Sequence, residues 1–405
     1  MKNKFLDFSN KIFVILFFPS FVTGLFLPNL LCGIFIIMNM IINFKKIYSL
    51  ISDYLIIVFL FTIFCIIIVV SSLVSNYTLH SLESSALYIV YIIYSFSFVI
   101  LLKENKEARK LFFLFGIITC LILSLDAIYE FFNGSNVLGY YSIDGRLAGL
   151  FGDRWLLGRY LVYILPILVG FYFLESNQYK NYRTLIFLTF FLTSITIIFS
   201  GERAAFIMFF LYLFLILIFF FNKLSLYNLL KIFFLIIILF ITPFFFTETS
   251  ERLKDNFLLY LMSDDFEINQ YLSLYITSWL MFIDNPFLGI GPNNFRFSCS
   301  ESIYYVSKWS CSTHPHSITF QVLAELGIFG FIAVFSVLSY FIYKSTKLIF
   351  LTNYSKSTLG IYSLQCCIII YLFPFMITGN FFLSWYGFIY YLPISLFMVY
   401  SDKVK

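Results

Sequence analysis

The residues best suited to proton transfer are two histidines in the stretch THPHSITFQVLAELGIFGF, residues 313–331. His314 and His316 flank Pro315, and proline is tolerated in the first turn of a helix, where its missing N–H is not needed. We therefore expect HPH to begin a helix. The positive end of the helix dipole disfavours imidazolium, so a histidine there can stay neutral and accept a proton from a hydroxyl. A polar helix cap is the alternative interpretation. A zinc site is disfavoured, because no Cys, Asp or Glu lies nearby in ligand spacing.

Two polar residues follow inside the apolar run. Gln321 and Glu325 are four positions apart, so they share one face of a helix. Ionisable groups at membrane depth are costly and normally face a cavity or a partner. Glu325 would lie about 13 Å along the helix from His316, at about 1.5 Å per residue. We expect it to support the site without touching the reacting group, and we expect Gly327 and Gly330 to permit close helix packing.

Hydropathy predicts the elements that position these residues. Hydrophobic residues make up 61% of the chain and charged residues 12%, whereas a soluble domain carries roughly 25% charged residues. Apolar runs long enough to cross a hydrocarbon core of about 30 Å recur along the sequence. The hydropathy pattern predicts an all-α polytopic membrane protein, with one transmembrane domain over residues 1–405 and no cleavable signal. About twelve helices are expected, with eleven or thirteen as alternatives: 12–27, 29–44, 54–72, 85–102, 111–128, 156–174, 185–200, 205–222, 231–247, 318–343, 358–378 and 381–400.

The basic residues predict an orientation. One set of loops holds 18 of the 26 basic residues, 16 of them lysine, and the positive-inside rule makes that side cytoplasmic together with both termini. The outer side holds all three histidines, including His80, and a long loop, 248–317, between helices nine and ten. Because the basic residues are scattered among loops, the sequence does not suggest a nucleic acid partner. The outer side also holds these arginines: Arg146, Arg154, Arg159, Arg203, Arg252 and Arg296.

An arginine guanidinium binds phosphate or carboxylate in bidentate fashion, so we interpret the outer arginines as an anion-binding set. Pairing with outer acidic residues is the alternative. In the segment SGER, residues 200–203, Gly201 helps the bend that brings Arg203 to the outer surface, where it could instead pair with Glu202 or with lipid headgroups.

Two further segments present arginines. Residues 284–296, DNPFLGIGPNNFR, use proline and glycine to fix a turn-rich path that ends at Arg296, ahead of the histidines. A structural loop with a solvated arginine is the alternative there. Residues 145–154, GRLAGLFGDR, combine glycine-exposed backbone with Arg146 and Arg154, but they lack the spacing and the Lys-Ser/Thr of a P-loop.

The cysteines divide into two groups. Five lie in apolar runs and are expected to be reduced packing residues. Cys299 and Cys311 lie in the outer loop between Arg296 and His314, where an oxidising compartment would permit a disulfide. Such a bond would join the ends of the segment that presents both candidate groups, and two unpaired thiols are the alternative.

In combination these segments resemble a known family. HPHS with Gln321, Glu325, Gly327 and Gly330 resembles the HPHN-x-x-LQ-x-x-x-E-x-G-x-x-G pattern of the bacterial O-antigen ligase and polymerase superfamily. DNPFLGIGPNNF ahead of the histidines, SGERAAF at a helix end and GRLAGLFGD before a span also look like segments of that family. Their order and spacing match over residues 146–330.

The resemblance implies a metal-independent glycosyltransferase that needs no cofactor. Such an enzyme transfers a glycan from undecaprenyl diphosphate to a sugar hydroxyl on the periplasmic face of the inner membrane. The acceptor would be lipid A–core for a ligase or another repeat unit for a polymerase, and membrane lipid surrounds the protein. By motif, Arg203 and Arg296 would bind the diphosphate, and His316 would be the base. The expected substrate-binding or supporting residues are Arg146, Arg154, His314 and Glu325.

Two departures from the family pattern stand out. Ser317 occupies the position after the second histidine, where the family usually has asparagine. An arginine that many members carry shortly before the tryptophan matched by Trp279 is absent, and Arg252 or Lys254 could supply its contact.

A lipid-linked glycan transporter is the alternative function. A flippase should carry charges through its helices on both sides of the membrane midplane, whereas the unusual charges here gather at the outer face. A structural subunit of an assembly complex would leave the histidine and the arginines without a purpose.

Overall fold

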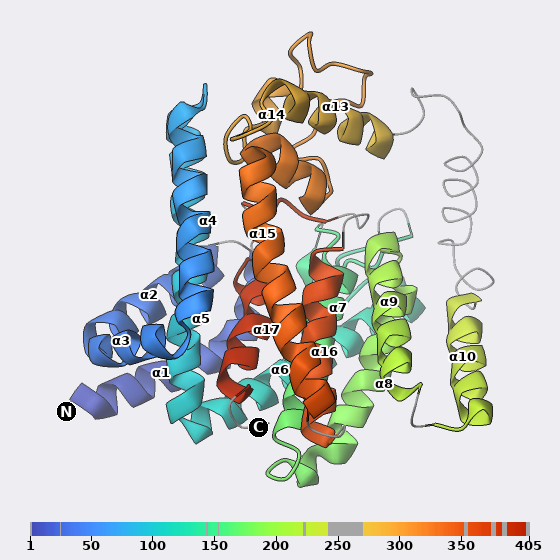
Figure 1. The fold of residues 1–405 in the computed structure, drawn as a ribbon. Helices are drawn as coiled ribbons and strands as arrows, with labels where there is room; N and C mark the ends of the chain where they lie inside the picture. The colour runs from blue at the N-terminus through green and yellow to red at the C-terminus, as the bar shows by residue number, and fades with distance from the viewer. Residues whose placement is uncertain are drawn as a thin grey trace.

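The computed structural model is a helical bundle, shown in Figure 1. It describes residues 2–24, 26–142, 145–152, 154–221, 224–241, 270–351, 355–373, 378–382 and 387–401. In this part of the chain eight helices are long and apolar enough to cross a membrane, or up to nine if a bent pair counts as one span. The prediction of an all-α polytopic membrane protein is confirmed, and the count of twelve spans is not.

Many consecutive helices are joined by a few residues, while residues 134–156 and 299–317 form longer connections. The helices of ten or more residues are α1 Lys2–Ser20, α2 Phe26–Ile42, α3 Phe44–Asp53, α4 Leu55–Val74, α5 Thr78–Glu104, α6 Lys106–Asn133, α7 Leu157–Leu174, α8 Arg183–Phe199, α9 Arg203–Phe220, α10 Leu226–Ile241, α13 Gln270–Asp284, α15 Ile318–Leu351, α16 Lys356–Tyr371 and α17 Gly387–Tyr400. Shorter helical turns are η1 Phe21–Thr23, η2 Gly149–Phe151, η3 Lys180–Tyr182 and α14 Phe295–Ser298.

The helices of the structure differ from the expected ones at several places. After α2 the chain bends by 97° and continues as α3, which the hydropathy pattern did not resolve. The apolar helices α10 and α17 are shorter than 18 residues. The expected outer loop 248–317 contains α13, which crosses the upper end of α15, and the small helix α14 (Figure 1). Residues 242–269, and with them Arg252 and Lys254, lie outside the described part of the chain.

Aromatic side chains fill the bundle where α1, α5, α6 and α7 meet. The rings of Phe17 and Tyr94 stack at 5.9 Å, and those of Phe98 and Phe112 lie 5.2 Å apart. The Tyr160 hydroxyl donates a hydrogen bond to the Phe18 carbonyl at 2.6 Å. Since lipid tails are as apolar as these rings, close packing and such hydrogen bonds hold membrane helices together. They fix the start of α7, which borders the candidate site.

The helix α15 is broken at Gly327, whose φ of 64° is non-helical. The break leaves two carbonyls and two N–H groups without helical partners, and the loop 286–291 takes all four. The bonds are Ile290 N–H to Ala324 (3.0 Å), Gly291 N–H to Glu325 (3.0 Å), Ile328 N–H to Pro286 (2.8 Å) and Phe329 N–H to Phe287 (3.3 Å). Backbone groups at membrane depth must be satisfied within the protein, and this insertion satisfies them.

Glycine is required where the loop and the broken helix cross. A Cβ on Gly327 would lie 2.5 Å from the Phe287 carbonyl oxygen, and one on Gly289 would lie 2.3 Å from the Glu325 carbonyl carbon. Real side chains do not tolerate such contacts. The expectation that Gly327 serves helix packing is therefore wrong: it admits the loop that carries Arg296 into the line of the helix.

Candidate active site

His314 and His316 lie in an irregular segment ahead of α15, which begins at Ile318. The expectation that HPH forms the first turn of the helix is wrong. The residue before a proline is disfavoured in helical geometry, and His316 has φ 59°, in the left-handed region. The N–H of Thr378 donates to the His316 carbonyl at 2.9 Å and ties this turn to the segment between α16 and α17.

The hydrogen bonds of His314 fix its tautomer. Its Nε2 lies 3.0 Å from the backbone carbonyl of Thr378. A carbonyl only accepts, so Nε2 carries the proton. Nδ1 is then the acceptor and takes the hydroxyl proton of Thr313 at 2.8 Å. Both nitrogens of this buried ring are engaged, which suits a supporting role.

His316 is more open, and its Nε2 faces a hydroxyl. The Ser312 Oγ lies 3.2 Å from that nitrogen, and the two histidine rings lie 4.2 Å apart. Burial lowers the pKa of His316 to about 4, with the Arg159 guanidinium as the next cause. Burial likewise lowers the pKa of His314 to about 3. Both rings are therefore neutral near pH 7, through burial and nearby positive charge and not through a helix dipole.

Arg296 lies on the short helix α14, at the end of a loop that Glu325 holds in place. The carboxylate of Glu325 accepts the backbone N–H groups of Asn293 at 2.9 Å and Phe295 at 3.0 Å. The Gln321 amide also donates to it at 3.0 Å. The Arg296 guanidinium donates from Nη2 to the Asn293 side-chain oxygen at 3.0 Å. Its Nε is buried with no hydrogen-bond partner among the described residues.

Arg296 and His314 are electrostatically coupled, because the positive charge of Arg296 contributes to the lowered pKa of His314. The structure therefore brings three of the expected residues, His314, His316 and Arg296, into one region at one end of the bundle. We call this end the histidine end.

The segment SGER packs against the segment GRLAG. The N–H of Leu147 donates to the Ser200 carbonyl at 3.1 Å, and a Cβ on Gly201 would lie 2.2 Å from the Gly145 carbonyl oxygen. Glu202 accepts the N–H of Gly158 at the start of α7, at 2.7 Å. Burial raises the pKa of Glu202 to about 7, which the Arg159 charge opposes. The hydrogen bond of Glu202 thus goes to the start of α7, while the neighbouring Arg203 begins α9.

The remaining outer arginines differ in their surroundings. The guanidinium of Arg146 lies 4.3 Å from the centre of the Trp155 ring, a cation–π contact. That of Arg154 lies beside Gly24, on the turn after α1, and the described contacts do not join it to either histidine. Arg159 affects the pKa of His314, His316 and Glu202.

Sequence reasoning counted Arg159 among the outer arginines without giving it a role. The signal that could have found it is the position of a charged residue two places into an apolar run. Thr378 was also missed, since its contribution comes from backbone atoms that composition does not reveal.

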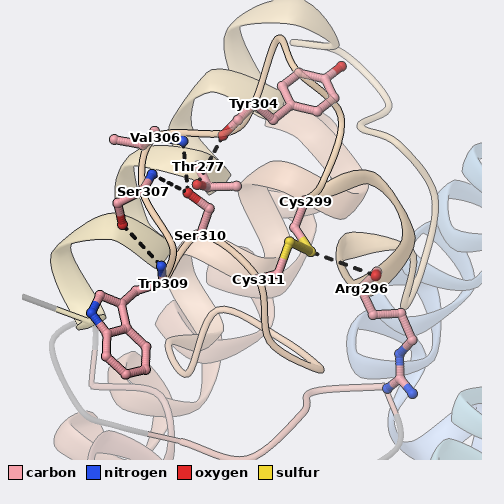
Figure 2. Close-up of a disulfide and its surroundings, with 9 residues drawn as sticks. All are labelled: Thr277, Arg296, Cys299, Tyr304, Val306, Ser307, Trp309, Ser310 and Cys311. Carbon is pink, nitrogen blue, oxygen red and sulfur yellow. Dashed lines mark hydrogen bonds between the residues drawn. A yellow bond between two sulfur atoms is a disulfide. The ribbon is translucent and has the colours of Figure 1, made fainter. Parts of the chain in front are cut away.

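Cys299 and Cys311 form a disulfide. Figure 2 shows the bond beside α14, with the Arg296 side chain directed away from it. The loop between the two cysteines is pinned on α13: Thr277 donates to the Tyr304 carbonyl at 3.1 Å, and Ser307 donates to Ser273 at 2.8 Å. The disulfide therefore joins the Arg296 helix to the segment that enters HPH.

The described residues contain no group of three His, Cys, Asp or Glu side chains that could hold a metal ion. The fold and site together define a polytopic membrane protein in which two histidines, Arg159 and Arg296 interact at one end of the bundle. Residues 188–335 match the family model described as O-antigen ligase, so this stretch is similar to members of that family. The match runs from α8 into α15 and includes SGER, the Arg296 loop and HPHS. A search of curated proteins found no match.

Proposed function

We propose that the protein transfers a glycan from undecaprenyl diphosphate to a sugar hydroxyl, as an O-antigen ligase or polymerase, at the periplasmic face of the inner membrane. The observation that carries the proposal is the neutral His316 ring, whose Nε2 faces the Ser312 hydroxyl and whose pKa is affected by the nearby Arg159. A neutral imidazole can accept the proton of an acceptor hydroxyl while that oxygen attacks the anomeric carbon. The carbon–oxygen bond to the diphosphate then breaks, with inversion.

The arginines would stabilise the leaving diphosphate. A diphosphate gains charge as the glycosidic bond breaks, and preorganised guanidinium groups aimed at it lower the barrier. Arg296 offers a buried Nε and is held by one bond to Asn293. Arg203 would act from the start of α9, and Arg146 and Arg154 would complete the binding surface. Because the guanidinium is already charged, such a site can act by positioning and electrostatics without a metal.

We assign to Arg159 the phosphate contact of the arginine that many family members carry before the tryptophan matched by Trp279 and that this chain lacks. The region in question holds Leu274, Tyr275 and Ile276, of which Leu274 is fully buried. Arg159 lies at the start of α7, and its positive charge contributes to the lowered pKa of both histidines.

Complementation of a deletion strain tests the proposal. His316→Ala should insert at normal abundance and abolish surface glycan, while Lys308→Ala, in an exposed loop position, should complement fully. One repeat unit on lipid A–core would indicate a polymerase, and unligated polymer on its carrier would indicate a ligase. Normal glycan with His316→Ala would refute the assigned base.

A further inference from the structure

The third histidine, His80, lies outside the HPH segment, in the first turn of α5, and faces the loop that carries Arg296. Its Nε2 lies 2.8 Å from the side-chain nitrogen of Asn293. That amide also donates to Ser84 at 3.2 Å, while its oxygen accepts from Arg296 at 3.0 Å and from Asn380 at 2.7 Å. Asn293 is fully buried and uses both donors and both acceptor positions of its side chain.

The direction of these hydrogen bonds is set by backbone groups at the other end of the chain of amides. The N–H of Phe381 donates to the Gln321 oxygen at 2.9 Å, so the Gln321 nitrogen must face Asn380. The N–H of Phe382 donates to the Asn380 oxygen at 2.9 Å. Backbone N–H groups cannot accept, so neither amide can be reversed.

The fixed orientation of Asn380 determines that of Asn293 and the tautomer of His80. With its oxygen facing Phe382 and Gln321, Asn380 must present its nitrogen to Asn293. Asn293 must then turn its oxygen to Asn380 and Arg296, and its nitrogen to His80. Since that nitrogen donates, the Nε2 of His80 has to accept. His80 is therefore in the tautomer protonated on Nδ1, the opposite of His314.

We infer that His80 is a positioning residue for Arg296: its unprotonated Nε2 accepts from the Asn293 amide and so keeps that side chain where its oxygen faces the guanidinium. A hydrogen-bond donor in place of the His80 Nε2 would face the Asn293 side-chain nitrogen, which is also a donor. Because the Asn293 oxygen is held by Asn380 and Arg296, the amide cannot simply reverse, and the repulsion between the two donors would push the whole side chain out of place. Arg296 would lose the hydrogen bond that aims it. This inference rests on the proposed function for the identity of the anion that Arg296 binds.

Nitrogen-15 NMR of the full-length chain in lipid reads the tautomers without any assay of transfer. The chain has three histidines, so each ring can be assigned by the resonance lost in His80→Gln, His314→Gln or His316→Gln. We expect an unprotonated Nε2 for His80 and a protonated Nε2 for His314. A proton on His80 Nε2 at neutral pH would overturn the inference whatever the protein catalyses.

Binding of undecaprenyl diphosphate to the purified full chain in detergent tests the effect on Arg296. His80→Gln keeps an acceptor and should leave Kd within about twofold, whereas His80→Lys should raise it about fivefold or more. Ser81→Ala is the matched control, because Ser81 bonds the Pro292 carbonyl and the Asn294 amide of the same loop without touching the Asn293 amide. It should change Kd less than His80→Lys at an equal loss of thermal stability.

A double-mutant cycle separates positioning from general destabilisation. In an Arg296→Ala background, His80→Lys should change Kd by less than about twofold, because the group it acts through is gone. Equal effects of His80→Lys in both backgrounds, or equal Kd for the Gln and Lys variants, would overturn the inference. A wild-type protein that does not bind undecaprenyl diphosphate would instead refute the proposed function, and the NMR result would still decide the tautomer.

Discussion

The two histidines of HPH are distinguished by what their ring nitrogens already contact. Both ring nitrogens of His314 are hydrogen-bonded, to Thr378 and Thr313. The Nε2 of His316 faces the Ser312 hydroxyl, which the hydroxyl of an acceptor sugar could replace. Two residues of the same type, two positions apart, can thus serve different purposes. The sequence pattern identified the pair, and the hydrogen bonds show that the two rings have different partners.

The rate of transfer should depend on pH through His316. Its pKa is lowered to about 4, so the base form persists well below neutral pH. We expect rates measured in detergent to hold from pH 7 to about pH 5 and to fall toward pH 4. The same lowered pKa makes folded protein less stable as pH falls below about 6.5, because the unfolded chain then binds more protons. Thermal melts at each pH must therefore accompany the rates, and a rate falling through pH 6.5 in fully folded protein would contradict the assignment.

Burial raises the pKa of Glu202 to about 7, so this carboxyl could add a second pH dependence near neutrality. Glu202→Gln is the control for it. Any change in rate near pH 7 that survives this substitution would have to be assigned to another group.

Arginine at position 296 should not be replaceable by lysine. A lysine keeps the charge but loses the planar fork that can hold Asn293 and a phosphate at once. We expect Arg296→Lys to reduce transfer about tenfold or more, and Arg296→Ala to reduce it about 10²–10³-fold. Initial rates at matched protein abundance would measure both. A transfer rate of Arg296→Lys equal to that of wild type would show that only the positive charge at this position matters.

At the scale of elements, three buried glutamates hold the loops of the site by their backbone. Glu130 accepts the N–H groups of Ala148 and Gly149 at 2.8 and 2.7 Å. Glu202 accepts from the start of α7, and Glu325 accepts from the Arg296 loop. Each carboxylate accepts backbone N–H groups and so fixes the backbone of a segment that carries an arginine.

The break in α15 should be intolerant of any side chain. Gly327→Ala adds a Cβ at 2.5 Å from a backbone oxygen and holds a non-glycine residue at φ 64°. The left-handed conformation alone costs about 1–2 kcal/mol, and the clash adds to it. We expect a clear fall in thermal stability together with loss of activity. Gly33→Ala is the matched control: it lies in α2 with no atom within 4 Å of the added Cβ, and it should melt at or above the wild-type temperature.

Most membrane helices could be predicted from the sequence, because an apolar run long enough to cross the hydrocarbon core is visible without knowledge of its neighbours. The break at Gly327 could not, since the apolar run continues through it and the groups that satisfy it come from residues 286–291, far back in the chain. The non-helical HPH has the same cause: its partner is the Thr378 backbone. Glu325 was expected to support the site without touching the reacting group, and the N–H groups that it accepts were not predictable from its own helix.

At the scale of the whole molecule, the chemistry gathers at the histidine end, while lysines dominate the opposite loops. We propose that the histidine end is periplasmic. Asn76→Cys, in the exposed turn between α4 and α5, should react with a membrane-impermeant maleimide on spheroplasts. Lys347→Cys, near the far end of α15, should react only after permeabilisation. The reverse pattern would place the site in the cytoplasm and rule out transfer at the periplasmic face.

The central claim is that this chain transfers a lipid-linked glycan with His316 as base. Its most direct test is purified protein in liposomes, with an undecaprenyl-diphosphate oligosaccharide and both candidate acceptors, followed by mass spectrometry of the products. We predict that wild type joins the glycan to one acceptor, with inversion and release of undecaprenyl diphosphate, and that His316→Ala binds the donor but transfers nothing. Equal transfer by His316→Ala, or movement of intact donor across the bilayer without transfer, would contradict the account.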